Sequence, residues 1–82
     1  MILSKTHTSE ACPSQWMGKL SDERMFYIRY RWGYLSVRVS RKKTDDLMDA
    51  VGGEEVYGEQ LGEDLDGMIS WDDIPKEALE KL

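Results

Sequence analysis

Apolar and polar residues alternate along the middle of the chain, between positions 15 and 39, as they do in the strands of an antiparallel sheet. The segment QWMGKL, residues 15–20, is followed by SDE at residues 21–23 and by a long alternating run at residues 24–31. Serine and aspartate favour turns because their short side chains hydrogen-bond the local backbone. The pattern therefore predicts a first β-hairpin.

A second hairpin is predicted around the tripeptide Arg31-Trp32-Gly33. Gly33 suits the left-handed position of a three-residue loop that ends in a β-bulge. A two-residue type I′ turn would require the bulky Trp32 to be left-handed, for which tryptophan is a poor choice. We therefore expect the three-residue loop, with Tyr30 opposite Tyr34.

This register gives the two faces of the hairpin different characters. The face expected to form the core carries Met25, Tyr27, Leu35, Val37 and Val39, with Arg29 near the tip. The second face carries Phe26, Ile28, Tyr30, Tyr34, Ser36 and Arg38. Because the second face is too apolar to be wholly solvated, the C-terminal half, a second copy of the chain or a partner is expected to cover part of it.

Two short helical segments are predicted after the hairpins. In TDDLMDAVGG, residues 44–53, Thr44 is the expected N-cap and Gly52 the expected end. A weak apolar stripe near the C-terminus predicts a second helical turn. The fold class is therefore α+β, a small antiparallel β-meander of three to four strands covered by one short helix and a C-terminal helical segment. Residues 1–13 are expected to be a flexible N-terminal segment and residues 14–82 a single domain.

Composition places the chain among small globular proteins, since 82 residues with 40% hydrophobic side chains suffice for one compact core. The single cysteine, Cys12, excludes an internal disulfide, and no run of 18 apolar residues occurs. We therefore expect a cytoplasmic protein that does not enter the membrane.

Charge is divided unevenly along the chain, although the net charge is −5. Residues 1–43 hold nine basic and three acidic side chains, whereas residues 44–82 hold two and thirteen. The halves either neutralise each other on folding or present an acidic surface to a basic partner.

The basic and aromatic hairpin is a candidate ligand site, because arginines bind phosphate groups and flat rings stack on bases. The thirteen carboxylates of the C-terminal half argue against direct nucleic-acid binding, since their field opposes a polyanion. A nucleotide-like small ligand needs only one arginine and one ring. The residues assigned to this alternative are Tyr30, Arg31, Trp32, Tyr34 and Arg38.

The acidic half is the leading candidate for binding a protein partner, including a basic nucleic-acid-binding host factor. Carboxylates can occupy a basic groove in such a partner, and aromatic side chains can anchor the contact. The residues assigned to this surface are Glu54, Glu55, Tyr57, Glu59, Glu63, Asp64, Asp66 and Trp71.

A third interpretation concerns GEDLDGMISWDD, residues 62–73, which can be aligned with the calcium-binding loop of an EF-hand. Gly67 falls on the required glycine, but Gly62 replaces the first ligand and Asp73 replaces the bidentate glutamate, so a degenerate loop is the most that this pattern supports. No phosphate-binding glycine loop or spaced catalytic set occurs elsewhere. We therefore predict a protein that is not an enzyme, without catalytic residues, cofactor or metal.

Two stretches within residues 12–40, CPSQWMGKL and MFYIRYRWGYLSVRVS, resemble small uncharacterised proteins encoded by bacteriophages and other mobile elements. Proteins from that setting are often inhibitors of host defence, including anti-CRISPR proteins and nucleotide-signal sponges. The resemblance implies a context and transfers no site residue to this chain. We therefore expect a phage-type inhibitor or adaptor that docks on a host nucleic-acid-processing or defence protein through acidic loops and exposed aromatics, and homodimerisation through the second face stays open.

Overall fold

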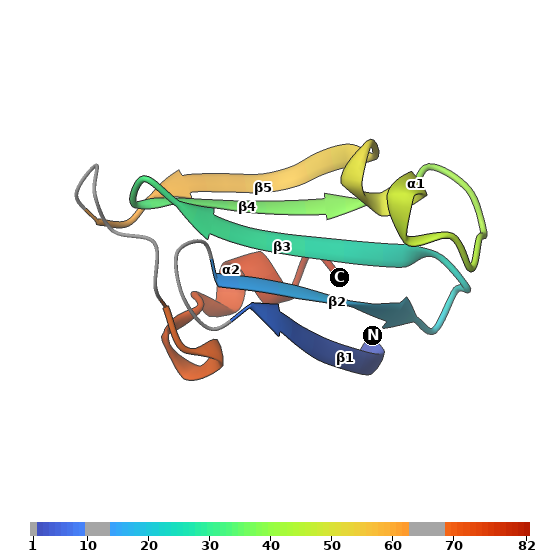
Figure 1. The fold of residues 1–82 in the computed structure, drawn as a ribbon, viewed down its shortest axis with the longest axis horizontal. Coiled ribbons are helices and arrows are strands. Elements are labelled where there is room, and N and C mark those ends of the chain that lie inside the picture. The colour runs from blue at the N-terminus through green and yellow to red at the C-terminus, as the bar shows by residue number, and fades with distance from the viewer. Residues whose placement is uncertain (1, 10–13, 63–68) are drawn as a thin grey trace.

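The computed structural model describes residues 2–9, 14–62 and 69–82. Within these ranges, five strands form one antiparallel sheet in which each strand pairs with the next along the chain (Figure 1). The strands are β1 (Ile2–Ser9), β2 (Ser14–Leu20), β3 (Met25–Arg31), β4 (Tyr34–Val39) and β5 (Glu54–Gln60). The short helices are α1 (Leu47–Val51), between β4 and β5, and the 3₁₀ turn η1 (Trp71–Asp73) and α2 (Lys76–Leu79), which follow β5. The antiparallel meander with small helices agrees with an α+β fold.

The sheet has five strands, which corrects the expected three to four. Strand β1 comes from residues that we expected to be flexible, and β5 is formed by the glycine-containing EEVYGEQ. Both strands lie at the edges of the sheet, and most of their described side chains are exposed. Edge strands are held largely by backbone pairing, so neither carries the apolar alternation that marks a strand in a sequence.

The register between β3 and β4 differs by one residue from the prediction. Arg31 pairs with Tyr34 and Tyr30 with Leu35, so the loop contains only Trp32 and Gly33. Both loop residues are left-handed, with φ of 57° and 71°, as a type I′ turn requires. The prediction excluded this turn because a left-handed Trp32 costs about 1–2 kcal/mol. It was wrong because a turn that matches the twist of the strands can offset that cost.

The corrected register exchanges the faces of β3. The apolar core consists of Trp16, Leu20, Phe26, Ile28, Tyr30, Leu35, Val37 and Val39, together with Ile74 and Ala78. Phe26, Ile28 and Tyr30, which we assigned to the second face, are thus buried with Leu35, Val37 and Val39. Tyr27 and Arg29 lie on the opposite face instead. In this register the buried positions of β3 and β4 are all apolar, whereas the predicted core face included Arg29.

The C-terminal segment packs on the core face, and it was one of the three possible covers for the face with Phe26, Ile28 and Tyr30. Ile74 and Ala78 are buried there, and the Trp71 ring packs edge-to-face on Trp16 with ring centroids 5.8 Å apart. The Lys5 ammonium lies 3.7 Å from the centroid of the Trp71 ring, a cation–π arrangement. Among the described residues, no helix is long and apolar enough to cross a membrane.

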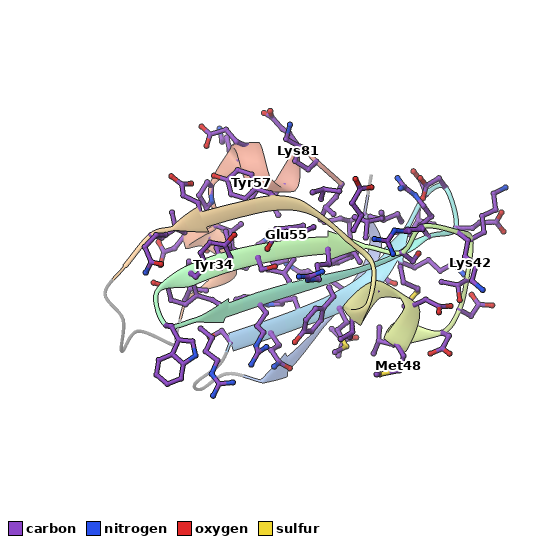
Figure 2. The ribbon with its side chains drawn as sticks, turned by 90° about the horizontal axis from the view of Figure 1, so that it is seen from above. Tyr34, Lys42, Met48, Glu55, Tyr57 and Lys81 are labelled. Atoms are coloured by element: carbon purple, nitrogen blue, oxygen red, sulfur yellow. The ribbon has the colours of Figure 1, made fainter. Side chains whose placement is uncertain are left out.

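Helix α1 lies on the other side of the sheet, where it contacts one end of β3 and β4. Figure 2 shows Met48 of α1 and Lys81 beside α2 on opposite sides of the strands. The N-cap is Asp46, whose carboxylate accepts from the Met48 amide at 2.9 Å, and Thr44 instead bonds Asp49. Gly52 ends the helix as expected. Since α1 is a single short helix, it leaves the rest of this face open.

Candidate functional site

The open face carries three rows of side chains that run across β3, β4 and β5. From the hairpin tip towards α1, the rows are Arg31–Tyr34–Gln60, Arg29–Ser36–Gly58 and Tyr27–Arg38–Glu55. All of these residues except Gly58, together with Trp32 and Val51, line a hollow of about 700 Å³. We call it the arginine–aromatic hollow.

On β4 and β5, the middle row has the smallest side chains, because Ser36 is short and Gly58 has no side chain. Gly58 also makes room for Tyr34. A Cβ atom at position 58 would lie 1.9 Å from the Tyr34 hydroxyl oxygen, so the phenol ring lies across the glycine backbone. Gly58 therefore has a structural reason at the site, since a side chain there would displace the Tyr34 ring.

Tyr34, Ser36 and Glu55 form a hydrogen-bonded group on the β4 and β5 side of the hollow, where Figure 2 places Tyr34 and Glu55. The Ser36 hydroxyl donates to Glu55 Oε1 at 2.7 Å, and the Tyr34 hydroxyl lies 3.4 Å from each carboxylate oxygen. Desolvation raises the pKa of the Tyr34 phenol, and the Glu55 charge raises it further, because both disfavour the phenolate. Tyr34 therefore remains a hydrogen-bond donor at neutral pH.

Three arginines give the hollow a positive character within an acidic chain. Arg38 donates to the Gly53 carbonyl at 3.0 Å, and the Arg31 guanidinium lies 4.9 Å from the centroid of the Trp32 ring. Arg29 Nε is buried and has no hydrogen-bond acceptor among the described residues. The ion pairs found in the described ranges are Lys19–Asp45, Arg24–Asp22 and Lys43–Glu23. They leave all three arginines of the hollow without a carboxylate partner in those ranges.

The structure brings together four of the five residues assigned to ligand binding. Arg31, Trp32, Tyr34 and Arg38 line the hollow, whereas Tyr30 is buried in the core on the opposite face. The sequence assignment missed Tyr27, Arg29, Ser36, Val51, Glu55 and Gln60. Predicting a type I′ turn at Trp32-Gly33 would have identified the missed residues on β3 and β4, because that register places them on the same face as Tyr34.

The described residues among those assigned to protein binding do not share one face of the sheet. Glu55 lines the hollow, whereas the Tyr57 and Trp71 rings are half-buried against the core on the other side of the sheet. Glu54 and Glu59 are exposed on β5. The Tyr57 hydroxyl donates to Glu59, which raises the pKa of the phenol to about 12. Glu63, Asp64 and Asp66 lie outside the described residues.

The proposed calcium loop falls largely on residues 63–68, which lie outside the described ranges. Of its remaining positions, Ser70 donates to Asp73 Oδ2 at 2.9 Å at the start of η1. Within the part of the chain that is described, no group of three or more metal-ligating side chains comes together.

Comparison of the chain with protein family models, with curated proteins and with solved structures finds no match. The functional interpretation therefore depends on the chemistry of the hollow.

Proposed function

We propose that the chain is a non-enzymatic binding module whose arginine–aromatic hollow holds a small anionic ligand with a flat ring, of the nucleotide kind. The observation that carries this proposal is that three arginines, Arg29, Arg31 and Arg38, line the hollow without a carboxylate partner in the described ranges. An anionic ligand would supply that partner.

The energetics of Arg29 favour an anion. A buried donor without a partner costs about 1–3 kcal/mol, and more when the group is charged. Native proteins keep few such groups, and a site for an ion is one of the common reasons. Phosphate oxygens, like those of a carboxylate, match the planar fork of a guanidinium, and Arg38 on the neighbouring strand adds a second positive charge.

Aromatic side chains supply the surface for a flat ring. Trp32 is 54% exposed and Tyr34 is 38% exposed, although both are large and apolar. Stacking of a base on such a ring contributes about 1–3 kcal/mol. The acidic remainder of the chain penalises a long polyanion more than a single nucleotide, because the repulsion accumulates with each phosphate.

The test is calorimetric titration and thermal unfolding of the protein with the four common nucleoside monophosphates. We expect binding that raises the melting temperature, because a ligand of the native state stabilises it by mass action. Inorganic phosphate and the free nucleosides should each bind more weakly than the nucleotides, because each makes only part of the contacts.

Arg29→Gln is expected to weaken nucleotide binding about tenfold or more, the loss associated with a charged hydrogen bond. The free variant should unfold at no lower temperature, because the substitution removes an unpartnered donor. Arg41→Gln is the matched control, since Arg41 is exposed and lies outside the hollow. Absence of any nucleotide-dependent shift, or equal affinities of wild type and Arg29→Gln, would contradict the proposal.

A second candidate function, docking on a basic protein, is favoured by the position of β5 at the edge of the sheet. An edge strand offers unpaired backbone groups to a partner, and this one carries the exposed Glu54 and Glu59. In this proposal the chain is an inhibitor or adaptor that steers onto a nucleic-acid-processing protein by charge.

Its test is the association of the protein with purified nucleic-acid-processing defence complexes at increasing salt. We expect binding that weakens with salt and falls in the double variant Glu54→Gln/Glu59→Gln. Glu77→Gln/Glu80→Gln, which changes the same charge on exposed positions near α2, is the control. Binding that responds to neither salt nor the β5 substitutions would exclude this mode of docking.

A further inference from the structure

Among the described residues that line the arginine–aromatic hollow, Glu55 is the one acidic side chain. It is not part of any ion pair found in the described residues. A carboxylate in this position repels the phosphate of a nucleotide ligand. Glu55 would favour binding only if it also made a hydrogen bond to an uncharged part of the ligand, such as the base. We propose that Glu55 selects the base, and that the ligand is a guanine nucleotide. This inference rests on the proposed function of the hollow as a nucleotide site.

The dimensions of the sheet separate a base-binding end from a phosphate-binding end. Glu55 lies on β5 and Arg29 on β3, with β4 between them. Neighbouring strands are about 4.8 Å apart, and the two residues also lie two positions, or about 7 Å, apart along the strands, so they are anchored roughly 12 Å from each other. This span is comparable to that from the base edge to the phosphate in a nucleoside monophosphate. The hollow is also within the usual size range of small-ligand sites.

The choice of base follows from what a carboxylate can do. An ionised carboxylate only accepts hydrogen bonds. Guanine presents two adjacent donors on its Watson–Crick edge, the N1–H and the N2 amino group, so both carboxylate oxygens can be used at once. Adenine, cytosine and uracil place an acceptor beside the donor on that edge. The acceptor would then face a carboxylate oxygen, and a site built for hydrogen bonds discriminates strongly against such a mismatch.

The surroundings of Glu55 leave the necessary acceptor capacity. A carboxylate has about four acceptor positions. Ser36 uses one of them at 2.7 Å, and the Tyr34 hydroxyl, at 3.4 Å, makes only a long contact. The bond from Ser36 orients the carboxylate. The half-exposed Tyr34 ring beside it offers a surface on which the selected base can stack.

The same guanine and phosphate chemistry occurs in a free nucleotide and in a nucleic-acid strand. The free nucleotide is the source favoured by the net charge of −5, because a strand would carry further phosphates over an acidic chain. A short guanine-containing single-stranded oligonucleotide therefore serves as a second probe.

The decisive experiment is calorimetric titration of GMP and AMP into the wild type, Glu55→Gln and the control Glu54→Gln. Glu54 is exposed on the same strand but does not line the hollow. The wild type is expected to bind GMP about tenfold or more tightly than AMP, the discrimination associated with a bidentate base contact. A glutamine amide presents an amino donor beside a carbonyl acceptor, and this pair matches N1 and N6 of adenine as well as O6 and N1–H of guanine. Glu55→Gln is therefore expected to abolish the preference for GMP, and Glu54→Gln to keep it.

The outcomes separate this inference from the proposed function. Equal affinity of the wild type for GMP and AMP overturns base selection while nucleotide binding stands. If Glu55→Gln strengthens both nucleotides by the same factor, Glu55 acts only through its charge and the inference is also overturned. If neither nucleotide binds the wild type, the proposed function itself fails. Tighter binding of the oligonucleotide than of GMP overturns the free nucleotide as the source.

Discussion

Replacement of Trp32 by asparagine is expected to make the protein more stable while weakening its ligand site. Trp32 has φ of 57°, a left-handed conformation that costs an L-residue about 1–2 kcal/mol. Asparagine tolerates this region, and Asn-Gly is the preferred pair for a type I′ turn. The substitution also removes the cation–π contact between Arg31 and Trp32. At an exposed site such a contact stabilises the fold by about 0.5 kcal/mol. The expected net effect is a stabilisation of about 1 kcal/mol.

The assay is thermal unfolding followed by circular dichroism. For a domain of this size, 1 kcal/mol raises the melting temperature by about 4–8 °C. Trp32→Ala is the control, because alanine loses the ring and keeps the left-handed cost, and its melting temperature should fall slightly. Because Trp32 lines the hollow, both variants should bind nucleotide more weakly than the wild type. Stability and binding are thus expected to change in opposite directions in Trp32→Asn, as is common at functional sites.

The result that would refute this reasoning is a melting temperature of Trp32→Asn at or below that of the wild type. In a three-residue loop, only Gly33 would be left-handed and asparagine would relieve no strain at position 32. The experiment therefore distinguishes the two registers of the hairpin, and with them the two assignments of the faces of β3.

Two further predictions concern the sheet and its edge. Gly18→Ala should destabilise the protein by about 3 kcal/mol in urea unfolding, because a Cβ at position 18 would lie 1.9 Å from the Ser4 carbonyl oxygen and 2.6 Å from the Phe26 ring. The control Gly52→Ala should change stability little, because the nearest atom to a Cβ at position 52 is 3.6 Å away. Equal effects of the two substitutions would contradict the observed approach of β1 to β2. The pKa of Tyr57 is raised from 10.0 to about 12, mainly by its hydrogen bond to Glu59, so the folded state holds the phenol proton more tightly than the unfolded state does. The resulting stabilisation is fully present below pH 10 and is lost as the pH rises towards 12. Ultraviolet titration of the tyrosines should show this late deprotonation in the wild type. An unchanged titration in Glu59→Gln would exclude the hydrogen bond as its cause.

The elements with strong local signals were predictable. The alternation in β2, β3 and β4, the end of α1 at Gly52 and the apolar side of the C-terminal segment all agree with the structure. Each depends on side-chain preferences over a few residues. Strand β1 was missed and β5 was interpreted as either a loop or one brief strand, because most described side chains of these edge strands are exposed and show no apolar alternation.

The candidate site was only partly predictable, for a reason that lies in one turn. Identifying Arg31, Trp32, Tyr34 and Arg38 required only an arginine-rich and aromatic hairpin. The assignment of Tyr30 was wrong, and Arg29 was missed, because a shift of one residue in register exchanges the two faces of a strand. The choice between loop types was made on the preference of Trp32 alone, which the pairing of the strands outweighs.

By itself, the sequence determined that the middle of the chain forms antiparallel hairpins and that positive charge and aromatic rings gather there, because both follow from local residue order. Only the tertiary structure decided which of those side chains share a face, because the register depends on the summed pairing and packing of whole strands. It also brought Glu55 of β5 beside Ser36 and Tyr34, a contact between residues about twenty positions apart that only the folding of β5 onto β4 can create.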